Sequence, residues 1–151
     1  MSYSPTLDSF DTDRDGLRRK IVPIAAAVLV AAIALTAYGA HDMGEILVVT
    51  AVILATTAGV YGLLLPRKLR QESAGGTSLT MSLVGLALLL PAFWSGLPLV
   101  LGVAGAILGY AGRKATKGAG MSQAGFAIGV LSSVGYFAVY VLDALNQAGI
   151  G

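Results

Sequence analysis

Four long apolar stretches, separated by short polar segments, dominate the pattern of this chain. They cover residues 21–39, 45–65, 79–112 and 122–145. Only Glu45 and Asp143 place an acidic or basic side chain within them. At about 1.5 Å rise per residue, a helix of about 20 apolar residues matches a hydrocarbon core of roughly 30 Å. The pattern therefore predicts an all-α, polytopic helical membrane protein.

The third stretch, residues 79–112, is too long for a single span. As one helix it would extend about 50 Å, well beyond the hydrocarbon core. Its centre contains Pro91, Gly96 and Pro98, which favour a turn, and Trp94, which suits a membrane interface. We therefore predict a tight helical hairpin here and about five transmembrane helices in total. The fourth span is short, and full crossing and re-entry both stay open.

All ten Lys and Arg residues lie in three clusters beside the apolar stretches. They are Arg14, Arg18, Arg19, Lys20; Arg67, Lys68, Arg70; and Arg113, Lys114, Lys117. A hairpin over 79–112 puts all of them on one side of the membrane, whereas a single span would put the last cluster opposite the others. Cationic residues resist translocation, so we predict a cytoplasmic N-terminus in a multi-pass protein of the plasma membrane.

These boundaries divide the chain into five segments. The first apolar stretch, residues 21–39, is longer than the apolar region of a signal peptide, so we expect it to be retained in the mature protein. Pro23 is expected in the first turn of the first span, and Pro66 is expected to stop the second. The segments are a flexible cytoplasmic tail (1–20), a two-helix transmembrane hairpin (21–65), a cytoplasmic loop (66–78), a three-helix transmembrane domain (79–145) and a short external tail (146–151).

Composition agrees with lipid as the main solvent. Hydrophobic residues make up 56% of the chain and charged residues 12%, and the net charge is +2. The basic residues flank apolar stretches instead of forming a basic stripe, so we expect anionic lipid headgroups as their partner and no nucleic acid. The chain has no Cys, which excludes disulfides and thiolate metal sites.

Two acidic groups invite a metal-binding interpretation. Residues 11–16 reproduce the first half of a calcium loop, with Asp11, Asp13 and Asp15 followed by Gly16, but the position of the final bidentate acid is Val22. Asp residues before a helix also favour its macrodipole, so helix capping is the preferred reading, and cation binding stays open. A second group, at residues 41–45, contains one His and two acids and is expected to be a solvated external loop. We predict no cofactor and no resident metal.

Hydroxyls inside the stretches have no His or acidic partner at helical spacing, so no nucleophilic triad is predicted and the chain is not expected to be an enzyme. Small residues form the more informative pattern, because they let membrane helices approach closely. Ala51, Ala55 and Gly59 share one register in the second stretch. The predicted helix-packing residues are Gly102, Gly105 and Gly109 in the fourth span and Gly125, Gly129 and Ser133 in the fifth. Packing within the chain is favoured over a homodimer face.

Residues 77–145 resemble a bacterial integral-membrane family, the domain of unknown function catalogued as number four-one-nine-zero. The residues that carry the resemblance are 99–109 (LVLGVAGAILG), the basic turn from Arg113 and Lys114 to Gly118 and Gly120, and 124–129 (AGFAIG). The resemblance implies a small helical membrane domain. It implies no activity and no catalytic residues.

Three functional hypotheses follow. The first is a non-enzymatic accessory or scaffold subunit that docks to a larger membrane complex or to a second copy. The second is a small transporter or channel for an apolar or small solute, although intramembrane charge that would couple an ion gradient is missing from the sequence. The third, an intramembrane enzyme, ranks last because no acid–base pair is visible.

Overall fold

The structure, a computed structural model, describes residues 5–39, 42–70, 74–113 and 118–149, with side chains described for 19–38, 42–69, 75–113 and 118–149. Within these ranges the chain is helical and contains no strand. The prediction of an all-α fold is therefore confirmed for this part of the chain. Three helical segments are long and apolar enough to cross a membrane, namely Arg19–Tyr38, Met43–Leu69 and Ala119–Gln147.

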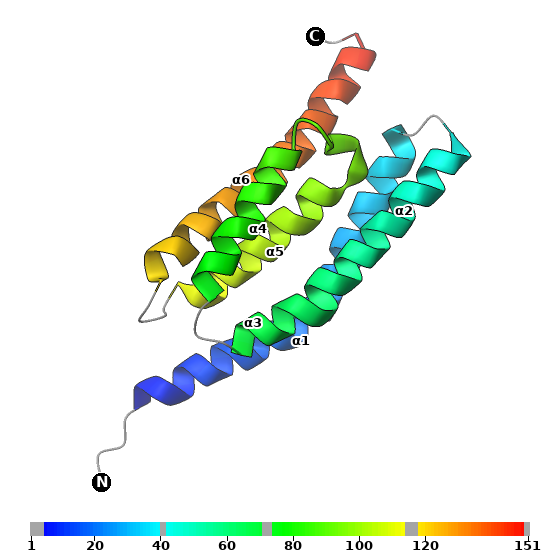
Figure 1. Cartoon of the computed structure of the whole chain (residues 1–151). Coiled ribbons are helices and arrows are strands. Elements are labelled where there is room, and N and C mark those ends of the chain that lie inside the picture. Colours follow the sequence, from blue (N-terminus) through cyan, green and yellow to red (C-terminus); the bar gives the residue numbers. More distant parts are fainter. Residues whose placement is uncertain (1–4, 40–41, 71–73, 114–117, 150–151) are drawn as a thin grey trace.

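The helices of the described residues form five rods. These rods lie in two groups (Figure 1). The first group is a hairpin of α1 (Pro5–Gly39) and a continuous rod made of α2 (Met43–Thr57), the π-helix η1 (Ala58–Leu64) and α3 (Leu65–Arg70). The second group contains α4 (Ala74–Leu88), α5 (Leu97–Gly112) and α6 (Ala119–Gln147). In the second group, α4 and α6 run parallel and α5 runs antiparallel to both (Figure 1).

The first helix begins earlier than the sequence analysis expects. The flexible tail predicted for residues 1–20 is wrong from Pro5 onward, because α1 spans 35 residues from that point. Consequently Pro23 lies inside the helix and not in its first turn.

Pro66 does not end the second rod, contrary to the prediction. A proline in a helix clashes with the carbonyl four residues earlier, here that of Gly62, and removes one hydrogen bond. The π-helix η1 lies directly before it, and the Leu65 N–H donates to the Val60 carbonyl five residues back. The wider π turn accommodates the proline ring, so the rod continues to Arg70.

The long stretch 79–112 is two antiparallel helices and not one. The turn between them contains a single 3-10 turn, η2 (Phe93–Ser95), followed by Gly96 with a φ of 67°. This left-handed conformation favours glycine, and Pro98 sits in the first turn of α5. Within the range 66–78, which is predicted to be a loop, residues 66–70 belong to α3 and residues 74–78 belong to α4.

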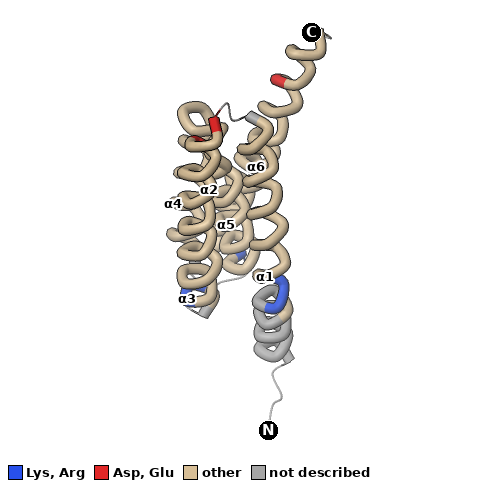
Figure 2. The backbone as a smooth tube through the Cα atoms, turned by 90° about the vertical axis from the view of Figure 1, so that its right-hand side faces the viewer, with Lys and Arg blue, Asp and Glu red and all other residues tan. Residues whose placement is uncertain are grey.

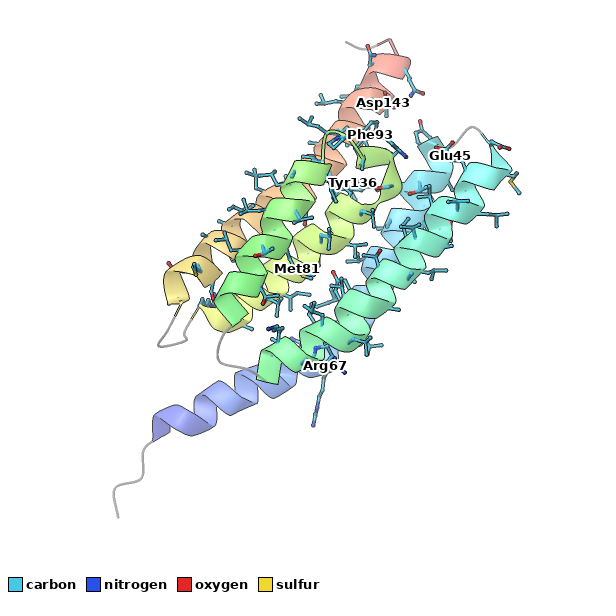
Figure 3. The ribbon with its side chains drawn as sticks, in the orientation of Figure 1. Glu45, Arg67, Met81, Phe93, Tyr136 and Asp143 are labelled. Atoms are coloured by element: carbon cyan, nitrogen blue, oxygen red, sulfur yellow. The ribbon has the colours of Figure 1, made fainter. Side chains whose placement is uncertain are left out.

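Basic and acidic residues lie at different ends of the bundle (Figure 2). The described Lys and Arg residues lie at the end where α3 and α5 finish, and the described Asp and Glu residues lie toward the opposite end. Figure 3 shows the same separation, with Arg67 at one end and Glu45 and Asp143 at the other. We refer to these as the basic end and the acidic end.

The core lies between the hairpin and the three-helix unit. Ala32, Ile53, Leu65 and Val100 are fully buried and come from α1, α2, α3 and α5. Two hydrogen bonds connect the groups of helices across this core. The Thr36 hydroxyl donates to the Trp94 carbonyl at 3.1 Å, and the Tyr61 hydroxyl donates to the Val100 carbonyl at 3.1 Å.

Candidate functional site

The closest helix contacts lie in the three-helix unit, where serines of α4 bind the backbone of its neighbours. The Ser78 hydroxyl donates to the Gly105 carbonyl of α5 at 2.8 Å. The Ser82 hydroxyl donates to the Gly125 carbonyl of α6 at 2.6 Å. Both serines are fully buried. The sequence analysis missed the role of Ser78 because it put this residue in a loop, although Ser78, Ser82 and Gly85 share the spacing of one small-residue helix face.

The predicted packing glycines of α5 divide between two neighbours. Gly105 faces α4, where an added Cβ would lie 2.9 Å from the Ser82 nitrogen. Gly109 faces α6, where an added Cβ would lie 2.5 Å from the Phe126 nitrogen. Gly102 also faces α6, at 3.1 Å from the Gly129 carbonyl oxygen. Backbone therefore occupies the space of a side chain at Gly105 and Gly109, whereas at Gly102 the contact is close but less restrictive.

The predicted residues of α6 contact both α4 and α5. A Cβ on Gly125 would lie 2.8 Å from the Leu79 nitrogen of α4, and one on Gly129 would lie 2.5 Å from the Gly102 carbonyl of α5. Ser133 is half-buried, and its hydroxyl donates to its own helix at the Gly129 carbonyl, 2.8 Å away. The three helices therefore meet through small residues on every pairwise interface.

The small residues of the second rod behave differently. Ala51 and Ala55 are exposed, and a Cβ on Gly59 would meet nothing within 4 Å. The buried side of this rod carries larger residues such as Ile53 and Tyr61. The opposite side carries four small exposed residues, which we name the outward face: Ala51, Ala55, Ala58 and Gly62.

A line of hydroxyls follows the buried side of α6 toward the acidic end. Ser132, Tyr136 and Tyr140 are one turn apart, and their hydroxyls have no hydrogen-bond partner among the described residues. Tyr136 is 0% exposed and Tyr140 8%. The Phe93 ring lies against Tyr140, with 6.0 Å between the ring centroids, and Figure 3 shows Phe93 and Tyr136 in the same region. Both tyrosine side chains therefore face the core of the bundle.

The basic end contains five of the predicted topology and headgroup residues with described side chains, and the side chains of the other four, Arg18, Arg70, Lys114 and Lys117, lie outside the described residues. Arg19, Lys20, Arg67 and Arg113 are exposed, and Lys68 is half-buried. The Arg113 guanidinium lies 3.8 Å from the centre of the Tyr110 ring. Such stacking holds an exposed arginine in place.

The structure describes only part of the proposed metal groups. The side chains of Asp11, Asp13 and Asp15, and all of His41, lie outside the described residues. Among the side chains that are described, no three of the type His, Cys, Asp or Glu lie close enough together to hold a metal ion. The polar groups that the described residues offer to a ligand are therefore hydroxyls, helix termini and surface cations.

Comparisons of the chain with protein-family models, with curated proteins and with solved structures find no match. The resemblance over 77–145 accordingly stays a prediction. Function must be argued from the fold and its surfaces.

Proposed function

We propose that this chain is a multi-pass plasma-membrane protein that acts as a non-enzymatic accessory or scaffold subunit of a larger membrane complex. The outward face carries the proposal. Ala51, Ala55, Ala58 and Gly62 form a smooth, exposed strip on one side of the second rod, and a Cβ on Gly62 would meet nothing within 4 Å. Small residues are enriched where membrane helices associate, because backbone approach replaces the hydrophobic drive that lipid removes. We assign the strip to a helix of another membrane protein.

The proposed membrane placement has all five rods crossing, with the basic end in the cytoplasm in contact with anionic headgroups. Separation of described cations and described acids to opposite ends supports this placement. At about 1.5 Å per residue, α4 and α5 are each about 23 Å long, shorter than a hydrocarbon core of roughly 30 Å. We propose that the bilayer thins locally around them.

Cysteine labelling tests the placement, since the chain has no Cys of its own. We expect Met43→Cys, which is at the acidic end and exposed, to react with an impermeant maleimide added outside intact cells. We expect Gly120→Cys at the basic end to react only after the membrane is permeabilised. Reaction of Gly120→Cys in intact cells, with Met43→Cys reacting only after permeabilisation, would reverse the placement.

Crosslinking tests the docking proposal in native membranes. Ala55→Cys on the outward face should crosslink to a second membrane protein, which mass spectrometry then identifies. Leu131→Cys on α6 is the matched control, because Leu131 is 60% exposed but lies outside the strip. Crosslinking of Ala55→Cys to another copy of the chain would show that the outward face forms a homodimer and does not bind a different membrane protein. Equal lipid-probe labelling of both positions, with no protein adduct, would end the docking proposal.

A second function, a small transporter or channel, is supported by the hydroxyl line of α6. Ser132, Tyr136 and Tyr140 place unpartnered polar groups inside the bundle, in order toward Asp143 at the acidic end. Polar groups inside a membrane bundle mark solute paths when water or solute satisfies them. The test is flux of small neutral solutes into proteoliposomes: Tyr136→Phe should lower it, and flux equal to that of protein-free vesicles would exclude transport of those solutes.

A further inference from the structure

The buried side of the second rod repeats every four residues. Five side chains at this spacing are buried along α2, η1 and α3, namely Ile53, Thr57, Tyr61, Leu65 and Leu69. An α-helix turns by about 100° per residue, so each step of four residues exceeds a full turn by about 40°. Over the four steps from Ile53 to Leu69, an uninterrupted α-helix would therefore accumulate a rotation of about 160°.

An uninterrupted α-helix would turn the end of the rod away from the core. Leu65 would lie about 120° and Leu69 about 160° from the direction of Ile53. Ala51, on the outward face, also lies about 160° from Ile53, so Leu69 would join that face. Arg67 would lie about 40° from Ile53 and point toward the core. The structure shows the reverse, with Leu65 and Leu69 buried and Arg67 exposed (Figure 3).

The π-helix η1 supplies the missing correction. The Leu65 N–H donates to the Val60 carbonyl five residues back, where an α-helix would use the carbonyl four residues back. A single π turn therefore takes up one residue more than an α turn, which subtracts about 100° from the rotation of every later residue. After this correction Leu65 lies about 20° and Leu69 about 60° from Ile53. Arg67 lies about 140° away and so points outward, in agreement with its exposure.

Contacts around η1 are confined to one side of the rod. Tyr61, inside η1, is buried, and its hydroxyl donates to the Val100 carbonyl of α5 at 3.1 Å. An added Cβ on Gly59 or Gly62 would meet nothing within 4 Å. The rod can therefore take up an additional residue on its open side while Tyr61 holds the other side against α5.

We infer that η1 sets the rotational phase of the second rod: it absorbs one residue so that a single face stays on the core from α2 to α3. In its absence, Leu69 would leave the core for the side that carries the outward face, and Arg67 would turn from the surface toward the core. The inference concerns contacts within the chain, so it depends neither on the proposed membrane placement nor on a docked partner.

Single-residue deletions test the inference in the full chain, purified in detergent. Every variant carries Pro66→Ala, because a proline would obstruct the α-helix that a deletion creates. Deletion of Gly62 removes the residue that the π turn absorbs, so the rod should rewind as an α-helix that keeps α3 at its present angle. Helical circular dichroism should then show a melting temperature close to that of Pro66→Ala alone.

Deletion of Ala127 is the matched control. Ala127 is also small and exposed, but α6 is α-helical throughout. Its deletion would rotate Gly129 by about 100° relative to Gly125. Both glycines lie against the backbone of neighbouring helices, so this deletion should unfold the three-helix unit.

Cysteine reactivity reports the angle of α3, since the chain has no Cys of its own. In Pro66→Ala, Arg67→Cys should react with a maleimide at least about tenfold faster than Leu69→Cys, because a buried thiol reacts only after local opening. We expect the same ratio after deletion of Gly62.

A reversed ratio after deletion of Gly62 would show that α3 rotates with the lost residue, which would overturn the inference. Unfolding by this deletion, as complete as that caused by deletion of Ala127, would overturn it as well, because the second rod would then have no additional residue. Equal reactivity of the two cysteines before any deletion would contradict the assigned phase of α3.

Discussion

The two helical groups of this protein are held together by different means. In the three-helix unit, backbone meets backbone: an added Cβ on Gly109 would lie 2.5 Å from the Ser122 carbonyl oxygen, and serines bridge α4 to both neighbours. The hairpin buries larger side chains, such as Val28 of α1 and Ile53 of α2, and an added Cβ on Gly59 or Gly62 of the second rod would meet nothing within 4 Å.

The difference shows which surface is available to others. Gly105, Gly109, Gly125 and Gly129 already lie against neighbouring helices of the three-helix unit, so they cannot also bind a partner. The outward face of the second rod is not covered by any described residue, so it is available for an intermolecular contact. The same spacing of small residues therefore serves packing within the chain in one group and is available for association with a partner in the other. Only the position of neighbouring helices distinguishes the two roles.

The largest expected effect comes from adding one methyl group inside the three-helix unit. Gly109→Ala would place a Cβ against the backbone of both Ser122 and Phe126, so α5 and α6 must separate. We expect a loss of about 2–3 kcal/mol of unfolding free energy, the scale of overpacking. Unfolding in mixed detergent micelles, followed by helical circular dichroism, measures it. A stability equal to the parent chain would show that the close approach is unnecessary.

Gly96→Ala tests the junction between the groups. Its φ of 67° disfavours a side chain, and the new Cβ would lie 2.8 Å from the Cβ of Ala32 in α1. We expect a loss of about 2 kcal/mol, from conformational strain and the displaced contact together. Gly118→Ala is the control, since its φ is 81° but nothing lies within 4 Å, so it should lose only about 1 kcal/mol.

Identical losses in the two variants would mean that the α1 contact contributes nothing. Trp94 emission is the measurement, because the Trp94 carbonyl accepts the Thr36 hydrogen bond beside this turn.

The sequence predicted the helical class and the break in the third stretch, because Pro91, Gly96 and Pro98 act locally through their own backbone preferences. The prediction from sequence was wrong about the extent of helices, which local residue preferences alone do not determine. Residues 5–20 lack an apolar period yet are helical in the structure. The widening before Pro66 depends on how one helix accommodates a proline, which periodicity does not reveal.

The packing residues illustrate the same limit. Gly102, Gly105 and Gly109 are spaced by three and then four residues in the sequence. In the structure, Gly105 faces α4 and the other two face α6. The sequence treated Ala51, Ala55 and Gly59 as equivalent to them, and no described helix covers that side. Spacing identifies a small-residue face, whereas the identity of its partner depends on the assembly of the bundle.

A smaller effect is expected for the serine bridges of the three-helix unit. Ser82→Ala removes the 2.6 Å hydrogen bond to Gly125 and should lower the unfolding free energy by about 1 kcal/mol. Thr80→Ala is the matched control on the same helix: Thr80 is exposed, and its hydroxyl bonds only to Gly76 of its own helix at 2.9 Å. It should change stability by less than about 0.5 kcal/mol. Equal losses in micelle unfolding would assign the stability of α4 to helix propensity instead of to its bridges.

The smallest effect on stability is expected on the outward face. Gly62→Leu adds a large side chain where nothing lies within 4 Å, and the leucine improves helix propensity, so the unfolding free energy should change by less than about 1 kcal/mol. Yet the same leucine would separate a docked helix from the strip, so the Ala55→Cys crosslink to a partner should fall strongly in native membranes. Stable folding with a lost crosslink would assign this face to association alone. A large loss of stability would show instead that the strip is packed within the chain, and the contrast between the two helical groups would fail at this face.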